Sequence, residues 1–168
     1  LVVSAAVYIA SRSGAGNFFE GDIASLSVFD KVLSDSEINR IYRSGVETRG
    51  LYKSNGNLQG WYTLDKDVSS DGDIEDLSGK GRTGAMPLAS DRPAFSTSFP
   101  ALPIARGSAT FNGTTTLINI GGTEDWDSVV GSTGSPRLTV AAWVKPAGKG
   151  ENNTGRIFDI IKGIYAFN

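Results

Sequence analysis

The chain has 168 residues and a mass of 17.7 kDa, with 16 Lys and Arg against 18 Asp and Glu. It contains no Cys and no His, which excludes disulfide scaffolds, thiol nucleophiles, Ser–His couples and the usual zinc or copper ligand sets. A net charge of −2 and a pI near 5.1 argue against nucleic-acid binding, and no apolar stretch is long enough for membrane insertion.

The N-terminal part of the chain predicts two strands. Leu1 to Ala10 is rich in Val, Ala and Ile. We expect a strand there rather than a signal-peptide core, because the segment lacks an initiator Met and a basic leader. A second strand is predicted over Ile23 to Phe29, where alternation places Ala24, Leu26 and Val28 on one face.

A helix is predicted over Asp35 to Arg43. Ser34 is the expected N-cap, and Glu37 three residues later completes a Ser-x-x-Glu capping box. Gly45 suits the left-handed position that ends a helix. One apolar stripe of this helix contains Ile38, Ile41 and Tyr42.

The rest of the chain predicts short strands separated by loops. Residues 46–57 read as a linker, and residues 86–106 hold four of the six prolines, which restricts them to irregular or edge structure. Five further strands are expected at Leu58–Leu64, Ser108–Phe111, Thr115–Ile120, Leu138–Val144 and Arg156–Lys162. This pattern predicts an all-β protein, an antiparallel β-sandwich or jelly roll with one short α-helix.

Two sets of motifs resemble one family. Phe19 to Tyr42 contains a Phe-x-Gly-x-Ile turn, a strand and a Leu-Ser-x-x-Glu-Ile helix, and it resembles the closing signature of laminin-G-like domains. Gly60 to Leu64 and Asp76 to Gly81 resemble the opening of the same fold, a concanavalin A-like jelly roll. Ala109 to Ile120 is similar to a hairpin of that family, and Leu138 to Pro146 is similar to its "fTisaWvkp" strand.

The order of these motifs is unusual, because the closing motif precedes the opening ones and the family's middle strands are missing. Residues 1–46 are then the end of one laminin-G-like domain, 47–57 a linker and 58–168 the first part of the next, as in an excerpt from a longer protein. Alternatively, the chain is one circularly permuted domain. As a third alternative, subunits complete each other's sheets by strand exchange, because a bare half jelly roll exposes strand edges.

An acidic loop between residues 65 and 76 is the candidate metal site. Oxygen ligands at alternate positions suit calcium, although the loop does not fit an EF-hand. The predicted ligands are Asp65, Asp67, Asp71 and Asp76. The resemblance also implies calcium near the sheet rim. The alternatives are a solvated acidic loop and, for Asp76, an Asx turn at Ser78.

A second loop is the candidate ligand site. Trp126 lies between Asp125 and Asp127, and an aromatic ring beside carboxylates suits the faces and hydroxyls of a sugar. The alternative is that Trp126 plugs the loop, and core packing is expected for Trp61 and Trp143. No catalytic residue is assigned, because the Glu-x-Asp-x-x-Glu pattern of concanavalin-type glycosidases is missing.

The expected function is a non-catalytic recognition or adhesion module. By resemblance, it binds a glycan or a protein at a surface, with calcium as the one cofactor considered, and it is extracellular, on a cell surface or on a virion. The rival is a structural or decorating subunit of a virion, shell or filament that self-assembles by strand exchange. A glycosidase or lyase is the third class, and it requires two carboxylates in a cleft.

Overall fold

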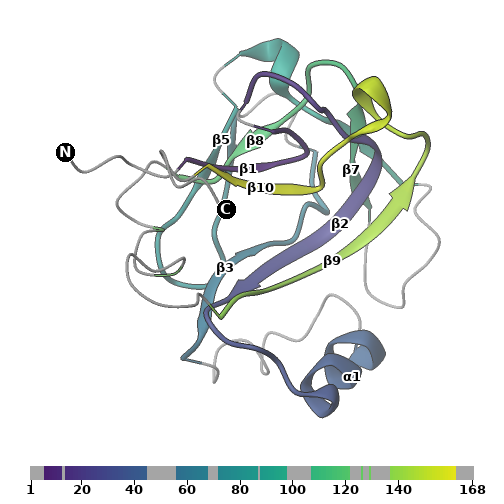
Figure 1. Ribbon diagram of the computed structural model, residues 1–168. Coiled ribbons are helices and arrows are strands. Elements are labelled where there is room, and N and C mark those ends of the chain that lie inside the picture. Colours follow the sequence, from purple (N-terminus) through teal and green to yellow (C-terminus); the bar gives the residue numbers. More distant parts are fainter. Residues whose placement is uncertain are drawn as a thin grey trace, which may run out of the picture.

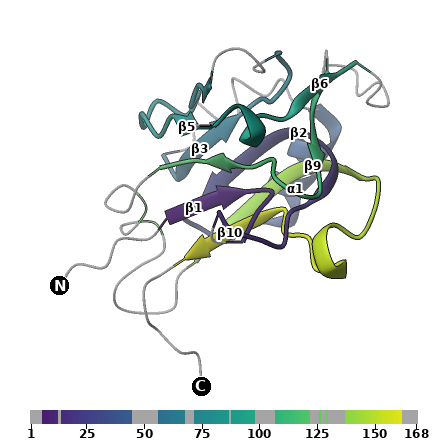
Figure 2. The same ribbon diagram turned by 90° about the horizontal axis from the view of Figure 1, so that it is seen from above.

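The computed structural model describes residues 6–12, 14–44, 56–67, 72–86, 88–97, 107–121, 126, 129 and 137–161. Within these residues, ten strands form two antiparallel sheets that pack as a sandwich (Figures 1 and 2), accompanied by one α-helix, α1 (Asp35–Ser44). The predicted all-β sandwich with a short helix is therefore confirmed.

The first sheet is assembled from both ends of the chain. In spatial order it contains β10 (Phe158–Ile161), β1 (Ala6–Ile9), β8 (Ile118–Asn119), β5 (Gly84–Ala85) and β4 (Asp73–Ile74). Strand β1 thus lies between β10 and β8, and it pairs antiparallel with each of them.

The second sheet is built around one long strand from the N-terminal part. Its order is β3 (Leu58–Tyr62), β2 (Glu20–Phe29), β7 (Ser108–Asn112) and β6 (Ala94–Ser96), and β9 (Thr139–Pro146) pairs with the other side of β2. Two 3-10 turns, η1 (Ala89–Asp91) and η2 (Glu151–Asn153), lie in the connections. Strands before residue 30 and strands after residue 57 therefore share both sheets.

A β-bulge at Ser25 changes the faces of β2. The backbone of Ser25 has a φ of +58°, and the register against β9 shifts between Ala24 and Leu26. The extra residue reverses the alternation, so Ile23, rather than Ala24, shares the main core with Leu26 and Val28. The prediction that Ala24 lies on the face of Leu26 is wrong for this reason.

The main core lies between the two sheets. Both sheets supply it with branched and aromatic side chains that are fully or almost fully buried. Its larger members include Ile9, Phe19, Ile23, Leu26, Tyr62, Phe111, Ile118 and Trp126. Burial of such side chains is the dominant favourable term in folding.

A smaller core lies on the outer face of the second sheet. It contains Phe29, Leu33, Leu58 and Trp61, with Ile41 of α1 packed against it. The helix therefore packs against this face, and in Figure 1 it lies below β2 and β9. The expectation of core packing is confirmed for Trp61, whose side chain is almost fully buried. It is wrong for Trp143, which is only partly buried because it faces outward and stacks on Tyr42 instead.

The capping box of α1 is confirmed. The Ser34 backbone N–H donates to Glu37 Oε2 (2.9 Å), and the Glu37 backbone N–H donates to Ser34 Oγ (3.4 Å). Lys31 Nζ also donates to Glu37 Oε1 at 2.6 Å. Hydrogen bonds from Lys31 and Ser34 hold the pKa of the Glu37 carboxyl at about 2, below its ordinary value of 4.5.

The lowered pKa of Glu37 predicts a pH dependence of stability. Because the folded-state pKa is below the unfolded value of 4.5, the stabilising contribution is complete above pH 4.5 and is lost as the pH falls through about 2. We expect the difference in unfolding free energy between wild type and Glu37→Gln to shrink over this window. An NMR titration of the Glu37 side chain with a midpoint near 4.5 would contradict the prediction.

Candidate functional site

Asp76 organises the loop that follows β3. Its Oδ1 accepts hydrogen bonds from the backbone N–H of Trp61 (3.0 Å) and of Ser78 (2.9 Å). Its Oδ2 accepts from Ser78 Oγ (2.8 Å) and from the Arg82 backbone N–H (3.0 Å). These four donors use the acceptor capacity of the carboxylate. Asp76 is therefore an Asx-turn residue, and its assignment as a calcium ligand is corrected.

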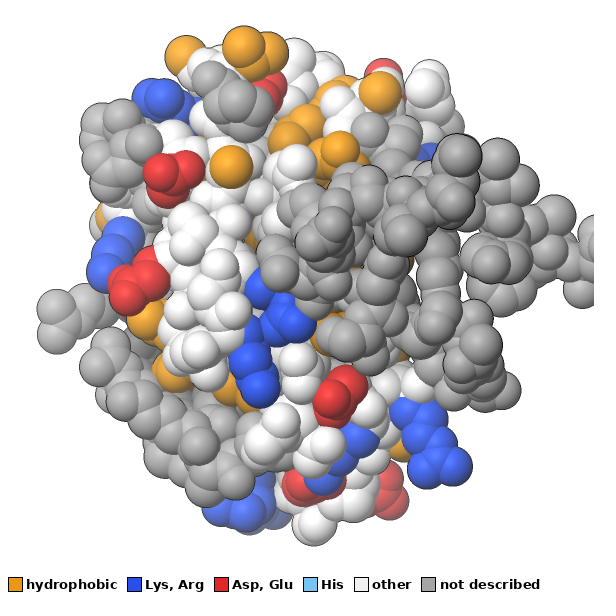
Figure 3. Space-filling model, turned by 90° about the vertical axis from the view of Figure 1, so that its left-hand side faces the viewer, with side chains coloured by type: hydrophobic (Ala, Val, Ile, Leu, Met, Phe, Trp, Pro, Cys, Tyr) orange, Lys and Arg blue, Asp and Glu red, His pale blue; other side chains and the backbone are white. Residues whose placement is uncertain are grey.

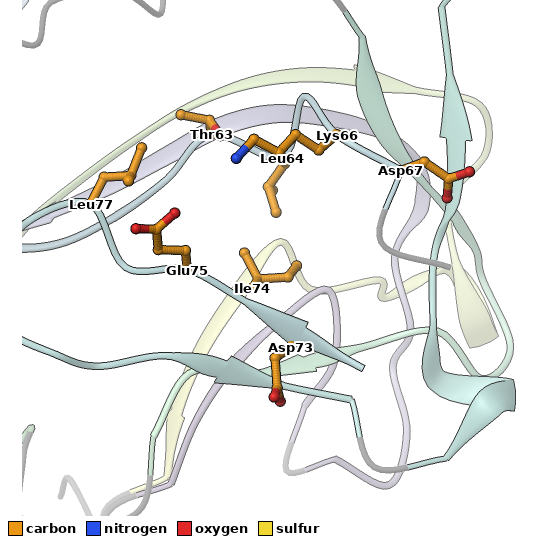
Figure 4. A pocket seen from close by; sticks show the side chains of 8 residues that line it. All are labelled: Thr63, Leu64, Lys66, Asp67, Asp73, Ile74, Glu75 and Leu77. Atoms are coloured by element: carbon orange, nitrogen blue, oxygen red, sulfur yellow. The ribbon is translucent and has the colours of Figure 1, made fainter. Parts of the chain in front are cut away.

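The other acidic side chains do not converge. Figure 4 shows the pocket beside β4 (Asp73–Ile74), in which Lys66 and Glu75 lie on one side while Asp67 and Asp73 point away from it. Asp65 lines a neighbouring pocket with Glu75, and Asp71 lies outside the described residues. Among the described residues no group of three or more His, Cys, Asp or Glu side chains is placed to hold a metal ion. Calcium binding at this loop stays a prediction.

The charged surface is mixed in sign. Figure 3 shows acidic and basic side chains interspersed on the face that it presents, where side chains are described. The chain as a whole has 16 basic and 18 acidic residues. This distribution suits a solvated surface, which is the alternative given for the acidic loop.

Trp126 is a core residue. Its side chain is fully buried, its Nε1 donates to the Ile120 carbonyl (2.7 Å), and the Arg82 guanidinium lies 4.9 Å from the ring centroid. The ring has no exposed face, so the prediction that Trp126 stacks on a sugar is wrong. The alternative, in which its side chain packs inward beneath the loop, is confirmed. Asp125 and Asp127, its predicted companions, lie outside the described residues.

Arg82 connects Trp126 to β3. Its Nη1 donates to the Gln59 carbonyl (2.7 Å), and its own carbonyl accepts a hydrogen bond from the Tyr62 hydroxyl (2.7 Å). Burial, together with the charge of Asp76, raises the pKa of the Tyr62 hydroxyl well above its ordinary value. A buried network of this kind fixes the loops at this end of the sandwich rather than offering a reactive group.

The structure reveals an aromatic pair that the sequence analysis did not assign to a site. Tyr42 of α1 stacks on Trp143 of β9, with ring centroids 5.5 Å apart and an interplanar angle of 24°. Tyr42 is 68% exposed and the neighbouring Ile38 is 50% exposed. The predicted helix stripe therefore faces the sheet, but only Ile41 of the three packs into the smaller core.

These side chains form a groove between α1 and the outer face of the second sheet. The groove has a volume of about 260 Å³, and its floor comes from β2 and from residues 140–143 of β9. Its two serine hydroxyl groups are already engaged, because Ser27 Oγ donates to the Ala141 carbonyl (3.3 Å) and Ser25 Oγ accepts from Trp61 Nε1 (3.4 Å). The groove, called the helix groove below, thus presents mainly apolar and aromatic surface.

The sandwich is open along one side. Figures 1 and 2 place β9 and β10 on the same side of the molecule, where each strand ends its own sheet. Among the described residues, six partly buried apolar side chains pack against the main core, and all of them come from this side: Leu138, Val140, Ala142, Val144, Phe158 and Ile160. The core is therefore incompletely covered along β9 and β10, and this side is called the open edge below.

Comparisons with protein-family models, with curated proteins and with solved structures find no match for this chain. The likeness to laminin-G-like domains therefore stays a resemblance in motifs. In the described part of the chain, no helix has the length and apolar character needed to cross a membrane.

The role of Asp76 gives a prediction for stability. Asp76→Asn replaces one carboxylate oxygen by an NH2 group, which leaves two of the four donors without their acceptor, and we expect a loss of unfolding free energy on the order of 3 kcal/mol. Asp73→Asn, at an exposed position of the same loop, is the matched control and should change it by no more than about 0.5 kcal/mol. Urea unfolding should give the same losses in calcium and in EDTA. A loss for Asp76→Asn seen only in calcium would contradict this role.

Proposed function

We propose that this chain is a non-catalytic β-sandwich module that recognises a protein partner at a surface. The observation that carries the proposal is the helix groove, with Tyr42 stacked on Trp143 and 68% exposed. Exposed apolar and aromatic groups that gather in one hollow are typical of binding sites. The motif resemblance to laminin-G-like domains supports the same class of function.

The chemistry of the groove favours a protein over a glycan. A sugar needs several hydrogen-bonding groups around its hydroxyls, whereas Ser25 and Ser27 are already bonded within the sheet. Tyr and Trp are the side chains that most often dominate the binding energy of protein interfaces. A partner that inserts an apolar side chain beside Tyr42 is therefore the better fit.

The resemblance extends the proposal in two respects. We propose that the strands of the sandwich are connected as a jelly roll, which is the connectivity of the concanavalin A-like superfamily that the motifs resemble. An extracellular, cell-surface or virion location is where such domains act as recognition modules. Both parts of the proposal are supported by the motifs of residues 19–42 and 58–146.

A structural role is the second candidate, and the open edge favours it. A sandwich in which, among the described strands, β9 and β10 each end a sheet on the same side is suited to extension by a neighbouring molecule. In this role the chain is a self-assembling subunit of a shell, filament or virion.

A binding screen tests the recognition role. The chain is applied to an array of purified cell-surface protein ectodomains and, in parallel, to a glycan array. We expect binding to a protein, and we expect Tyr42→Ala to weaken it about tenfold or more, because an aromatic anchor is lost. Leu88→Ala, which removes an exposed side chain outside the groove, should leave the affinity unchanged. Binding to glycans alone, or full affinity of Tyr42→Ala, would count against the proposal.

A further inference from the structure

We infer that β9 is a self-association edge, at which two copies of this chain pair their β9 strands antiparallel about a two-fold axis. The pairing joins the second sheets of the two molecules into one continuous sheet. This inference rests on the structural role proposed above, and it names both the surface and the occupant of the open edge.

Strand β9 lies at an unprotected edge of the second sheet. In the described structure, β9 (Thr139–Pro146) pairs with β2 on one side, and no other strand pairs with it. Residues 138–144 carry no charge, and Lys145 and Pro146 come only at the end of the strand. Soluble proteins usually protect an edge with charges, prolines or bulges inside the strand. A long uncharged edge is suited to pairing with another strand.

The core behind this edge is incompletely covered. Val140, Ala142 and Val144 of β9 and Phe158 and Ile160 of β10 pack against the main core but stay partly exposed. Because β9 and β10 lie on the same side of the sandwich, a molecule that pairs with β9 also approaches β10 (Figure 2). A second copy brings an equal apolar edge, so each molecule covers the other.

Alternate backbone groups of β9 point toward the free edge. Ser27 Oγ donates to the Ala141 carbonyl, so this carbonyl points toward β2. Backbone groups of successive residues in a strand point to opposite sides. The N–H and C=O groups of Val140, Ala142 and Val144 therefore point away from β2, toward the free edge.

These directions and the side chains select one register. With Ala142 on the two-fold axis, Val140 meets Val144 of the second copy on the inner face, and Ala141 lies opposite Trp143 on the outer face. A small residue opposite a large ring avoids a clash, and Lys145 meets the neutral Thr139. A register centred on Ala141 instead places Arg137 opposite Lys145, which is a repulsive pair.

Sedimentation velocity of the full chain, measured over a range of concentrations, tests the inference with Ala142→Pro as the variant. The Ala142 N–H points to the free edge, so proline there blocks pairing between copies and keeps the bonds to β2. We expect wild type to dimerise and Ala142→Pro to dimerise at least tenfold more weakly, with an unchanged far-UV circular dichroism spectrum.

Cross-linking keeps the test decisive if the proline variant does not fold. The chain has no Cys, so a single Ala142→Cys places one thiol on the two-fold axis. Opposite residues in an antiparallel pair lie about 5.5 Å apart, within the range of a disulfide. We expect mild oxidation to link Ala142→Cys into dimers. Ala94→Cys, on the exposed edge strand β6 at the far end of the same sheet, should stay monomeric.

The outcomes separate the inference from the role on which it rests. A wild-type chain that stays monomeric at all concentrations overturns both the β9 pairing and the structural role. An oligomer that forms equally in Ala142→Pro, or equal cross-linking at positions 142 and 94, overturns the β9 pairing and leaves self-assembly standing.

Discussion

The structure depends on strand β2 and on the bulge at Ser25. The strand pairs with β7 over Glu20–Ile23 and with β3 over Leu26–Phe29, while β9 follows its other side along nearly the whole length. One strand from the N-terminal part therefore holds three strands from the later part of the chain. The left-handed backbone of Ser25 costs on the order of 1 kcal/mol. This cost is offset by the hydrogen bond from the Ser25 N–H to the Thr63 carbonyl (2.7 Å) and by the burial of the β2 residues before and after Ser25.

The same bulge shapes both candidate interaction surfaces. By shifting the alternation, it directs Ile23, Leu26 and Val28 into the main core and leaves Ala24 and Ser27 on the outer face, opposite Trp143 and Ala141. The β2 part of the floor of the helix groove comes from Ser25 and Ser27, whose side chains are too small to fill the space below α1. On the inner face, β9 contributes Val140, Ala142 and Val144 to a core that it covers incompletely. Strand β9 therefore contributes to both surfaces: its outer face lines the helix groove, and its inner face forms part of the open edge.

Sequence reasoning predicted local features well, because their signals are local. The Ser34–Glu37 capping box, the strands around residues 23–29 and 138–144 and the Asx-turn alternative for Asp76 each depend on a few neighbouring residues. The bulge at Ser25 was missed because no glycine marks it. Trp126 was misassigned because its burial depends on Arg82 and Ile120, which the sequence does not place beside it. The helix groove was missed because an apolar stripe on a helix does not tell how closely the helix packs.

The segment before residue 30 and the segment after residue 57 form one sandwich through the pairing of β2 with β9. Cysteines at Ser27 and Ala141, which are opposite each other in this pairing, test it most directly because the chain has no Cys of its own. The account predicts that oxidation of Ser27→Cys/Ala141→Cys gives a disulfide within each chain and raises the midpoint of thermal unfolding. Bridges that form only between chains, or no bridge at all, would contradict it.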